Sequence, residues 1–205
     1  MKKIICYGDS NTFGYNPYDA SRYDKKTRWC AILQDNLKAQ YEVVDEGMCD
    51  RTAFMDNPNG FLFSGSQHFP KFILNSNNVY MLILWLGTND LQFQYDIKAH
   101  DIKKGLENLI KLAKTKTENI IIIPPVILNE NILKGYFKCQ FDKTSILKSK
   151  KVQKIYETIA HKHNCTFFDV NKFAKPSELD GLHYDKISHK IIANQLKQLI
   201  LSFDF

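Results

Sequence analysis

The chain has 205 residues, a mass of 23.9 kDa, 44% hydrophobic residues and 24% charged residues. This is enough for one domain with a substantial core and too little for two large ones, so we expect a single domain over residues 1–205. The net charge is +6, but the lysines are spread from Lys2 to Lys197, which gives little support to nucleic-acid binding.

The N-terminal segment and the cysteines both favour a cytoplasmic location. After Met1, Lys2 and Lys3, only residues 4–7 form an apolar run, which is too short for a signal-peptide core or a membrane span. The five cysteines are widely scattered and include no Cys-x-x-Cys pair. This pattern is not that of a disulfide framework and indicates reduced thiols.

Apolar runs of strand length alternate with helical patterns along the chain. The expected strands are residues 3–7, 41–45, 79–86, 119–123 and 166–169. The runs 79–86 and 120–123 are apolar throughout, as in central strands of a parallel sheet covered on both faces.

Helices are predicted between these strands. One begins near Trp29 and continues through Leu37, and a lysine-rich amphipathic one lies within residues 143–162. Two further helices are marked by apolar stripes, namely Ile102, Leu106, Leu109, Ile110 and Ala113, and then Ile187, Ile191, Leu196, Leu199 and Ile200. Irregular stretches, expected to form walls or lids of a site, are residues 16–28, 49–72 and 124–144. This alternation predicts a three-layer α/β/α domain that binds ligands at the carboxyl ends of its strands.

Ser10 is a candidate nucleophile. It lies in the turn Gly8-Asp9-Ser10 directly after the first strand, at the edge where ligands are expected. A phosphate-binding loop is excluded because no Gly-Lys-Ser/Thr follows, and the dinucleotide Gly-x-Gly-x-x-Gly pattern and the lipase Gly-x-Ser-x-Gly elbow are also missing. Taken alone, the tripeptide fits a harmless turn as well as a catalytic one.

Two further turns reach the same edge. Gly47 follows the second strand, and there it forms either an ordinary turn or a backbone N–H that faces a ligand. The third strand leads into Gly87-Thr88-Asn89-Asp90, where Asn89 carries an amide donor suited to a developing oxyanion. Asparagine after glycine is also ordinary turn chemistry.

The segment Asp180-Gly181-Leu182-His183 precedes the last helix. Residues three apart in a tight turn can place a carboxylate against one imidazole nitrogen and leave the other free to meet Ser10. A solvated loop or a metal ligand are the alternatives for such a pair. His161 and His163 are expected at a helix surface because residues two apart face different ways, and His189 is expected at the surface or in packing.

In this order the four motifs resemble those of the SGNH or GDSL hydrolase superfamily, from Ile4 to the final helix. The chain is most similar to the arylesterase and acyltransferase-like branch, on residues 8–14, 28–29, 41–47, 51–52 and 86–90. Asn11 replaces the name-giving leucine, and Cys49 and Asp50 stand where the branch often has smaller or amide residues. These departures bear on the acyl or alcohol preference rather than on the chemistry.

The resemblance implies the flavodoxin-like sandwich of SGNH hydrolases, with a five-stranded parallel sheet. It also implies a serine esterase for short-chain acyl esters in which Ser10 is the nucleophile, His183 the base and Asp180 the orienting acid. The Ser10 N–H, the Gly47 N–H and the Asn89 side chain would form the oxyanion hole. No metal or organic cofactor is needed for this chemistry.

Several alternatives remain open at this stage. A thioesterase, a lysophospholipase or a carbohydrate O-deacetylase would use the same groups. A binding module could keep the fold without turnover, and a metal-dependent phosphoesterase could be built on Asp9, Asn89 and His183. The expected partner is a small-molecule ester, and the long loops are compatible with a homo-oligomer.

Overall fold

The computed structural model describes residues 1–204. Its core is a sheet of five strands, all parallel, in the order β2-β1-β3-β4-β5. The strands are β1 (Lys2–Gly8), β2 (Tyr41–Gly47), β3 (Val79–Trp85), β4 (Ile120–Ile123) and β5 (Thr166–Phe167). This is the flavodoxin-like order, in which the strand order reverses between β1 and β3. The predicted α/β sandwich with a five-stranded parallel sheet is confirmed.

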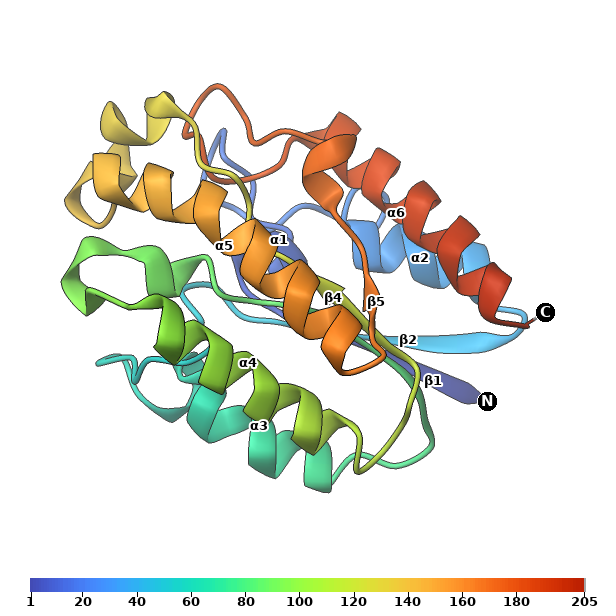
Figure 1. Cartoon of the computed structure of the whole chain (residues 1–205). Coiled ribbons are helices and arrows are strands. Elements are labelled where there is room, and N and C mark those ends of the chain that lie inside the picture. Colours follow the sequence, from blue (N-terminus) through green and yellow to red (C-terminus); the bar gives the residue numbers. More distant parts are fainter. Residues whose placement is uncertain (205) are drawn as a thin grey trace.

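Helices cover both faces of the sheet, as Figure 1 shows. On one face, α2 (Trp29–Leu37) packs against α6 (Lys186–Leu201). On the other lie α3 (Gly65–Leu74), α4 (Ala99–Ala113) and α5 (Lys143–Lys162). The short α1 (Ser10–Phe13) follows β1. The 3₁₀ segments are η1 (Phe61–Phe63), η2 (Asn89–Leu91), η3 (Phe93–Tyr95), η4 (Glu130–Leu133), η5 (Tyr136–Cys139), η6 (Val170–Lys172) and η7 (Ser202–Asp204).

The predicted strands begin and end close to the observed ones. Their apolar residues, which marked the strands in the sequence, are the residues that the fold buries. All residues of β4 are at most 1% exposed, as expected for a strand covered on both faces. The last strand is shorter than predicted, since β5 ends at Phe167. Asp169 instead caps η6 by accepting a hydrogen bond from the Asn171 N–H at 3.1 Å, and this turns the chain out of the sheet.

The expectation of an irregular stretch over residues 49–72 is wrong for its last part, where α3 lies. Pro70 is inside this helix, and a proline in that place removes one helical hydrogen bond. The helix forms nevertheless because Phe69 and Ile73 are fully buried, and Phe69 packs edge-on against Tyr7 of β1 at 4.9 Å. Tertiary packing outweighs local propensity here.

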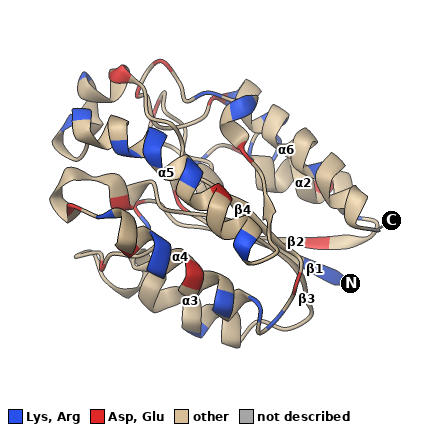
Figure 2. Cartoon of the chain, viewed as in Figure 1, with Lys and Arg blue, Asp and Glu red and all other residues tan. Residues whose placement is uncertain are grey.

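The outer faces of the helices carry the charges. On α5, Lys150, Lys151 and Lys154 are exposed while Val152 and Tyr156 are buried, so the predicted solvated lysine face is present. Figure 2 shows lysine and arginine distributed over several helices rather than gathered on one. Across residues 1–204, no helix is both long and apolar enough to cross a membrane.

The last helix differs from its predicted stripe at its first turn. Ile187 is 71% exposed, whereas His189 is fully buried and its Nδ1 accepts a hydrogen bond from the Trp29 N–H at 3.3 Å. Burial lowers the pKa of His189 to about 4, so the imidazole is neutral at pH 7 and can accept. The stripe is shifted because this histidine, rather than an aliphatic residue, packs α6 onto the start of α2.

Candidate active site

The turn that carries Ser10 is shaped by its neighbours. Asp9 caps α1, since its Oδ1 accepts the Asn11 N–H at 3.0 Å, and Ser10 is the first residue of the helix. A Cβ on Gly8 would lie 2.0 Å from Thr12 Oγ1 and 2.7 Å from the Trp85 carbonyl oxygen. Only glycine fits there, so the tight approach of β1, β3 and α1 that presents Ser10 depends on it.

Ser10, His183 and Asp180 form one continuous hydrogen-bonded chain. His183 Nε2 lies 2.9 Å from Ser10 Oγ, and His183 Nδ1 lies 2.7 Å from Asp180 Oδ2. The three side chains come from opposite ends of the sequence and meet at the carboxyl end of β1. This arrangement can activate a serine hydroxyl as a nucleophile.

The Asp180 carboxylate is fixed within its own turn. Its Oδ1 accepts the backbone N–H groups of Leu182 and His183, each at 3.0 Å. Burial alone would raise the pKa of Asp180, but the hydrogen bonds to His183 and Leu182 outweigh it and lower the pKa. Asp180 is therefore ionised at neutral pH and holds the imidazole with a proton on Nδ1.

Asn89 reaches the same edge from η2. Its Nδ2 donates to the Arg51 carbonyl oxygen at 3.0 Å, and its Oδ1 accepts from Gln92 Nε2 at 3.3 Å. The second N–H of the Asn89 amide has no acceptor within residues 1–204. The side chain is only 6% exposed, so its free N–H is held in one direction.

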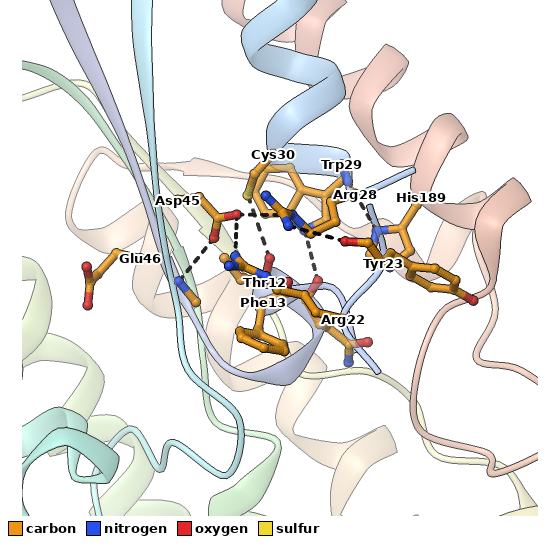
Figure 3. Close-up of polar contacts among 12 residues, drawn as sticks. Thr12, Phe13, Arg22, Tyr23, Arg28, Trp29, Cys30, Asp45, Glu46 and His189 are labelled. Carbon is orange, nitrogen blue, oxygen red and sulfur yellow. Dashed lines mark hydrogen bonds and ion pairs between the residues drawn. The ribbon is translucent and has the colours of Figure 1, made fainter. Parts of the chain in front are cut away.

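Gly47 is closely packed against α1, and its N–H has a partner in the protein. A Cβ at this position would lie 2.1 Å from the Phe13 nitrogen, while the Gly47 N–H donates to Asp45 Oδ1 at 3.3 Å. Figure 3 shows Asp45 also contacting Arg22 and Arg28, with Arg22 Nη2 at 2.8 Å and Arg28 Nε at 3.6 Å. The Gly47 N–H therefore points to this ion-pair cluster in the structure.

Arg51 connects the elements that meet at the site. It is fully buried, and its Nη1 donates to the carbonyl oxygens of Gly8 at 3.2 Å and Glu46 at 2.7 Å. Its own carbonyl oxygen accepts the Asn89 amide. The sequence marked Arg51 only as part of a resemblance, because nothing local shows that a guanidinium will be buried.

Asp50 and Gln92 lie next to Asn89 and are candidate site residues that the sequence did not indicate. Gln92 Nε2 donates to Asp50 Oδ1 at 3.1 Å as well as to Asn89. Asp50 has a φ of 61°, and its backbone N–H has no acceptor within the described part of the chain. A left-handed non-glycine residue with an unengaged N–H beside Asn89 is a further candidate oxyanion donor.

Aromatic rings enclose the imidazole of His183. Tyr15, in the loop after α1, has its ring centroid 4.1 Å from that of the imidazole. Phe137, in η5, has its ring centroid 5.2 Å from that of the imidazole. Two other aromatic residues near the motifs do not line the site: Trp85, at the end of β3, is buried in the core, and Phe93 of η3 is 45% exposed. The wall of the site is formed instead by Tyr15 and Phe137.

The metal-site alternative gains no support from the geometry. Asp9 is fully buried behind Ser10, and its Oδ1 accepts the Asn11 N–H. Burial raises the pKa of Asp9 to about 7, because the carboxylate has few compensating partners. Within residues 1–204, no three His, Cys, Asp or Glu side chains are grouped so that they could hold a metal ion.

Comparisons with known proteins identify the family and the fold. Residues 6–190 match the model of the GDSL-like Lipase/Acylhydrolase family, whereas a search of curated proteins gave no match. A carbohydrate acetylesterase family member from Sinorhizobium meliloti superposes with a TM-score of 0.88 at 27% identity, covering 98% of this chain and 97% of that one.

Two less identical structures share the fold. The inhibitor-bound aryl esterase of M. smegmatis has a TM-score of 0.91 at 23% identity, covering 98% of this chain and 99% of that one. Est24, a carbohydrate acetylesterase from Sinorhizobium meliloti, has a TM-score of 0.89 at 22% identity, covering 99% and 100%. The chain therefore belongs to the GDSL-like lipase/acylhydrolase family and is a carboxylic ester hydrolase of the SGNH type.

Proposed function

We propose that the protein hydrolyses short-chain acyl esters of small molecules through an acyl-enzyme on Ser10. The observation that carries this proposal is the hydrogen-bonded chain from Ser10 Oγ through His183 to Asp180, at 2.9 and 2.7 Å. Each member has the partner that its role requires: a base for the nucleophile and an ionised acid for the base.

In the proposed reaction, His183 Nε2 takes the Ser10 proton while Ser10 Oγ attacks the ester carbonyl carbon. The imidazolium then gives that proton to the departing alcohol oxygen, which breaks the ester bond and leaves an acyl-serine. Water attacks the acyl-serine with His183 again as the base, and the products are a carboxylic acid and free Ser10. Asp180 stays ionised and stabilises the imidazolium in both halves.

The oxyanion is proposed to bind the Ser10 N–H, the Asn89 Nδ2 and a backbone N–H from the loop after β2. Gly47 is the donor that the sequence indicates, and for this role its bond to Asp45 at 3.3 Å must be shared or broken. The Asp50 N–H, which has no acceptor within residues 1–204, supplies the same kind of donor without that competition.

The narrow surroundings of the nucleophile support a short acyl group. Ser10 is 7% exposed and His183 is 2% exposed, and the rings of Tyr15 and Phe137 lie against the imidazole. Removal of acetyl groups from sugars is a variant of this activity, favoured by the 27% identical carbohydrate acetylesterase family member.

The direct test is Ser10→Ala, assayed with p-nitrophenyl acetate and labelled with a fluorophosphonate probe. We expect the wild type to turn over the ester and form an adduct on Ser10, and the folded variant to do neither. Folding is checked by circular dichroism. Turnover by the variant would remove Ser10 as the nucleophile, and a wild type that neither labels nor turns over would favour a binding module.

The substrate class is tested with the wild type alone. A panel of acetyl, butyryl and octanoyl esters, a thioester and an acetylated sugar should give the highest kcat/KM with an acetyl ester. A preference for octanoyl would contradict the short-chain proposal, and a preference for the thioester would replace the ester by that class.

Other properties stay as predictions. We propose one hydrolase domain over residues 1–205, because the described residues form one five-stranded sheet and one hydrophobic core. The cytoplasmic location rests on the scattered cysteines, all five of which are free thiols.

A further inference from the structure

Asn11 stands where the family's name-giving motif has leucine, and its side chain is 1% exposed. Its Nδ2 donates to the Leu182 carbonyl oxygen at 3.3 Å, and its Oδ1 accepts the Tyr184 N–H at 3.3 Å. These two backbone groups lie on either side of His183 in the sequence. One side chain on the nucleophile helix thus binds both flanks of the catalytic histidine.

The chemistry of the pair requires an amide. A backbone carbonyl needs a donor and a backbone N–H needs an acceptor, and a carboxamide offers both from adjacent atoms. Leucine offers neither, and an ionised aspartate offers only acceptors. The identity of these backbone partners therefore also fixes which way the Asn11 amide points.

Apart from the Ser10–His183 hydrogen bond and the contact of the Tyr15 ring with His183, the two parts that Asn11 links are held by separate contacts. The turn that carries His183 is held from the C-terminal segment, because Asp180 Oδ1 accepts the His183 N–H at 3.0 Å and the His183 carbonyl oxygen accepts the Ser177 N–H at 2.7 Å. Ser10 is held from β1 and α1. Asn11 follows Ser10 directly, so its bonds set the position of the turn relative to the nucleophile.

We propose that Asn11 is a positioning residue that keeps His183 Nε2 within hydrogen-bonding distance of Ser10 Oγ. The proposal rests on the proposed roles of Ser10 and His183. Its consequence is kinetic, because a displacement of about 1 Å between reacting groups can lower a rate by roughly 10²-fold. Because the Asn11 side chain is only 1% exposed, we expect substrate binding to be largely unaffected.

The test replaces Asn11 by leucine, which removes both bonds at similar volume. We expect kcat for p-nitrophenyl acetate to fall by roughly 10-fold to 100-fold while KM changes by less than about two-fold. Thr12→Val is the matched control: Thr12 is on the same helix, 1% exposed, and its Oγ1 has no hydrogen-bond partner within residues 1–204. Its kcat should stay within about two-fold of the wild type.

A double-mutant cycle separates positioning from general destabilisation. In a His183→Ala background, Asn11→Leu should have no further effect on the residual activity, because the group that it positions is gone. An equal loss with and without His183, or an unchanged kcat in the single variant, would overturn the proposal. If Asn11→Leu does not fold, Asn11→Asp keeps the acceptor for Tyr184 and places an oxygen against the Leu182 carbonyl, and the same cycle applies.

The activities of these variants distinguish failure of the proposed function from failure of the positioning role of Asn11. Full activity in Ser10→Ala or His183→Ala would contradict the proposed function itself. Loss of activity in both, combined with an unaffected Asn11→Leu enzyme, would contradict only the positioning role.

Discussion

The two sides of the active site are built differently. On the acid–base side, Asp180 and His183 are three residues apart, and Asp180 binds the imidazole and two backbone N–H groups of its own turn. On the oxyanion side, Asn89 takes its position from Arg51, which is 38 residues away, and from Gln92. A local turn carries its own geometry, whereas the position of the proposed oxyanion donor Asn89 depends on how distant loops pack.

Buried charges hold the loops on the oxyanion side. Arg51 binds the ends of β1 and β2 through the carbonyl oxygens of Gly8 and Glu46. The buried Asp90 carboxylate accepts the N–H groups of residues 53–55 at 2.6 to 2.9 Å. These contacts fasten the loop that carries the Arg51 carbonyl, so the direction of the Asn89 amide follows from the fold rather than from its own turn.

The largest effect on turnover is expected on the acid–base side. Asp180→Asn should lower kcat by about 10⁴-fold, as in other triads, because an amide stabilises the wrong imidazole tautomer and cannot stabilise the imidazolium. The check is kcat with p-nitrophenyl acetate, with folding verified by circular dichroism. A loss smaller than about ten-fold would mean that His183 is oriented by the rest of its turn without the charge.

A smaller effect is expected from the oxyanion side. Asn89→Ala should lower kcat by roughly 10²-fold to 10³-fold with little change in KM, because the donor acts on the charge that develops in the transition state. The exposed amide of Asn59, which donates to Asp50 Oδ2 at 2.8 Å, provides the control variant Asn59→Ala. An Asn89 variant with an altered KM and an unchanged kcat would place that side chain in substrate binding instead.

The residue that orients the Asn89 amide, Gln92, can be compared with Asn89 itself. The Asp50 carboxylate has only acceptors, so Gln92 must present its NH₂ group, and this group in turn requires the oxygen of Asn89. Gln92→Met should lower kcat by roughly ten-fold, less than loss of the Asn89 donor itself. The exposed Gln40, in the turn before β2 and away from this network, is the control when changed to Met and should keep nearly full activity. Equal losses in both variants would show that the effect is not specific to the Asn89 amide.

The smallest effect on turnover is expected at Asp9, the fully buried residue that precedes Ser10 and caps α1. Burial raises its pKa from 3.8 to about 7, so between these values the native state holds a proton that the unfolded chain has lost. Stability should therefore fall as pH rises from about 4 to about 7, by at most roughly 4 kcal/mol.

Asp9→Asn should remove that pH-dependent loss and keep the helix cap, since asparagine can accept the Asn11 N–H equally well. The measurement is the free energy of urea unfolding of wild type and variant at pH 4, 5.5 and 7. The kcat of the variant should stay within a few-fold of the wild type. If the difference in unfolding free energy between variant and wild type does not grow as pH rises from 4 to 7, Asp9 is ionised in the native protein.

The sequence predicted the sheet better than some of the helices. Runs such as Ile120–Ile123 are apolar on both faces, so their place in the centre of a parallel sheet follows from composition. Helix α3 was missed because Pro70 and the polar residues around it argue locally against a helix, and only the burial of Phe69 and Ile73 outweighs this. His189 was left open between the surface and packing, because its partner, the N–H of Trp29, is 160 residues away.

The sequence by itself indicated the family, the strands that the motifs follow, and Asp180 and His183 as the candidate acid–base pair. These features are encoded in short segments whose spacing already carries the geometry. The tertiary structure decided which way the Gly47 N–H points, that Arg51 is buried, and that Asn11 binds both flanks of His183. The bonds of Arg51 to Gly8 and of Asn11 to the His183 turn join distant segments, and the Gly47 N–H is bound by Asp45, which pairs with Arg22 and Arg28. The direction of a polar group in the interior is set by the partners that folding brings to it.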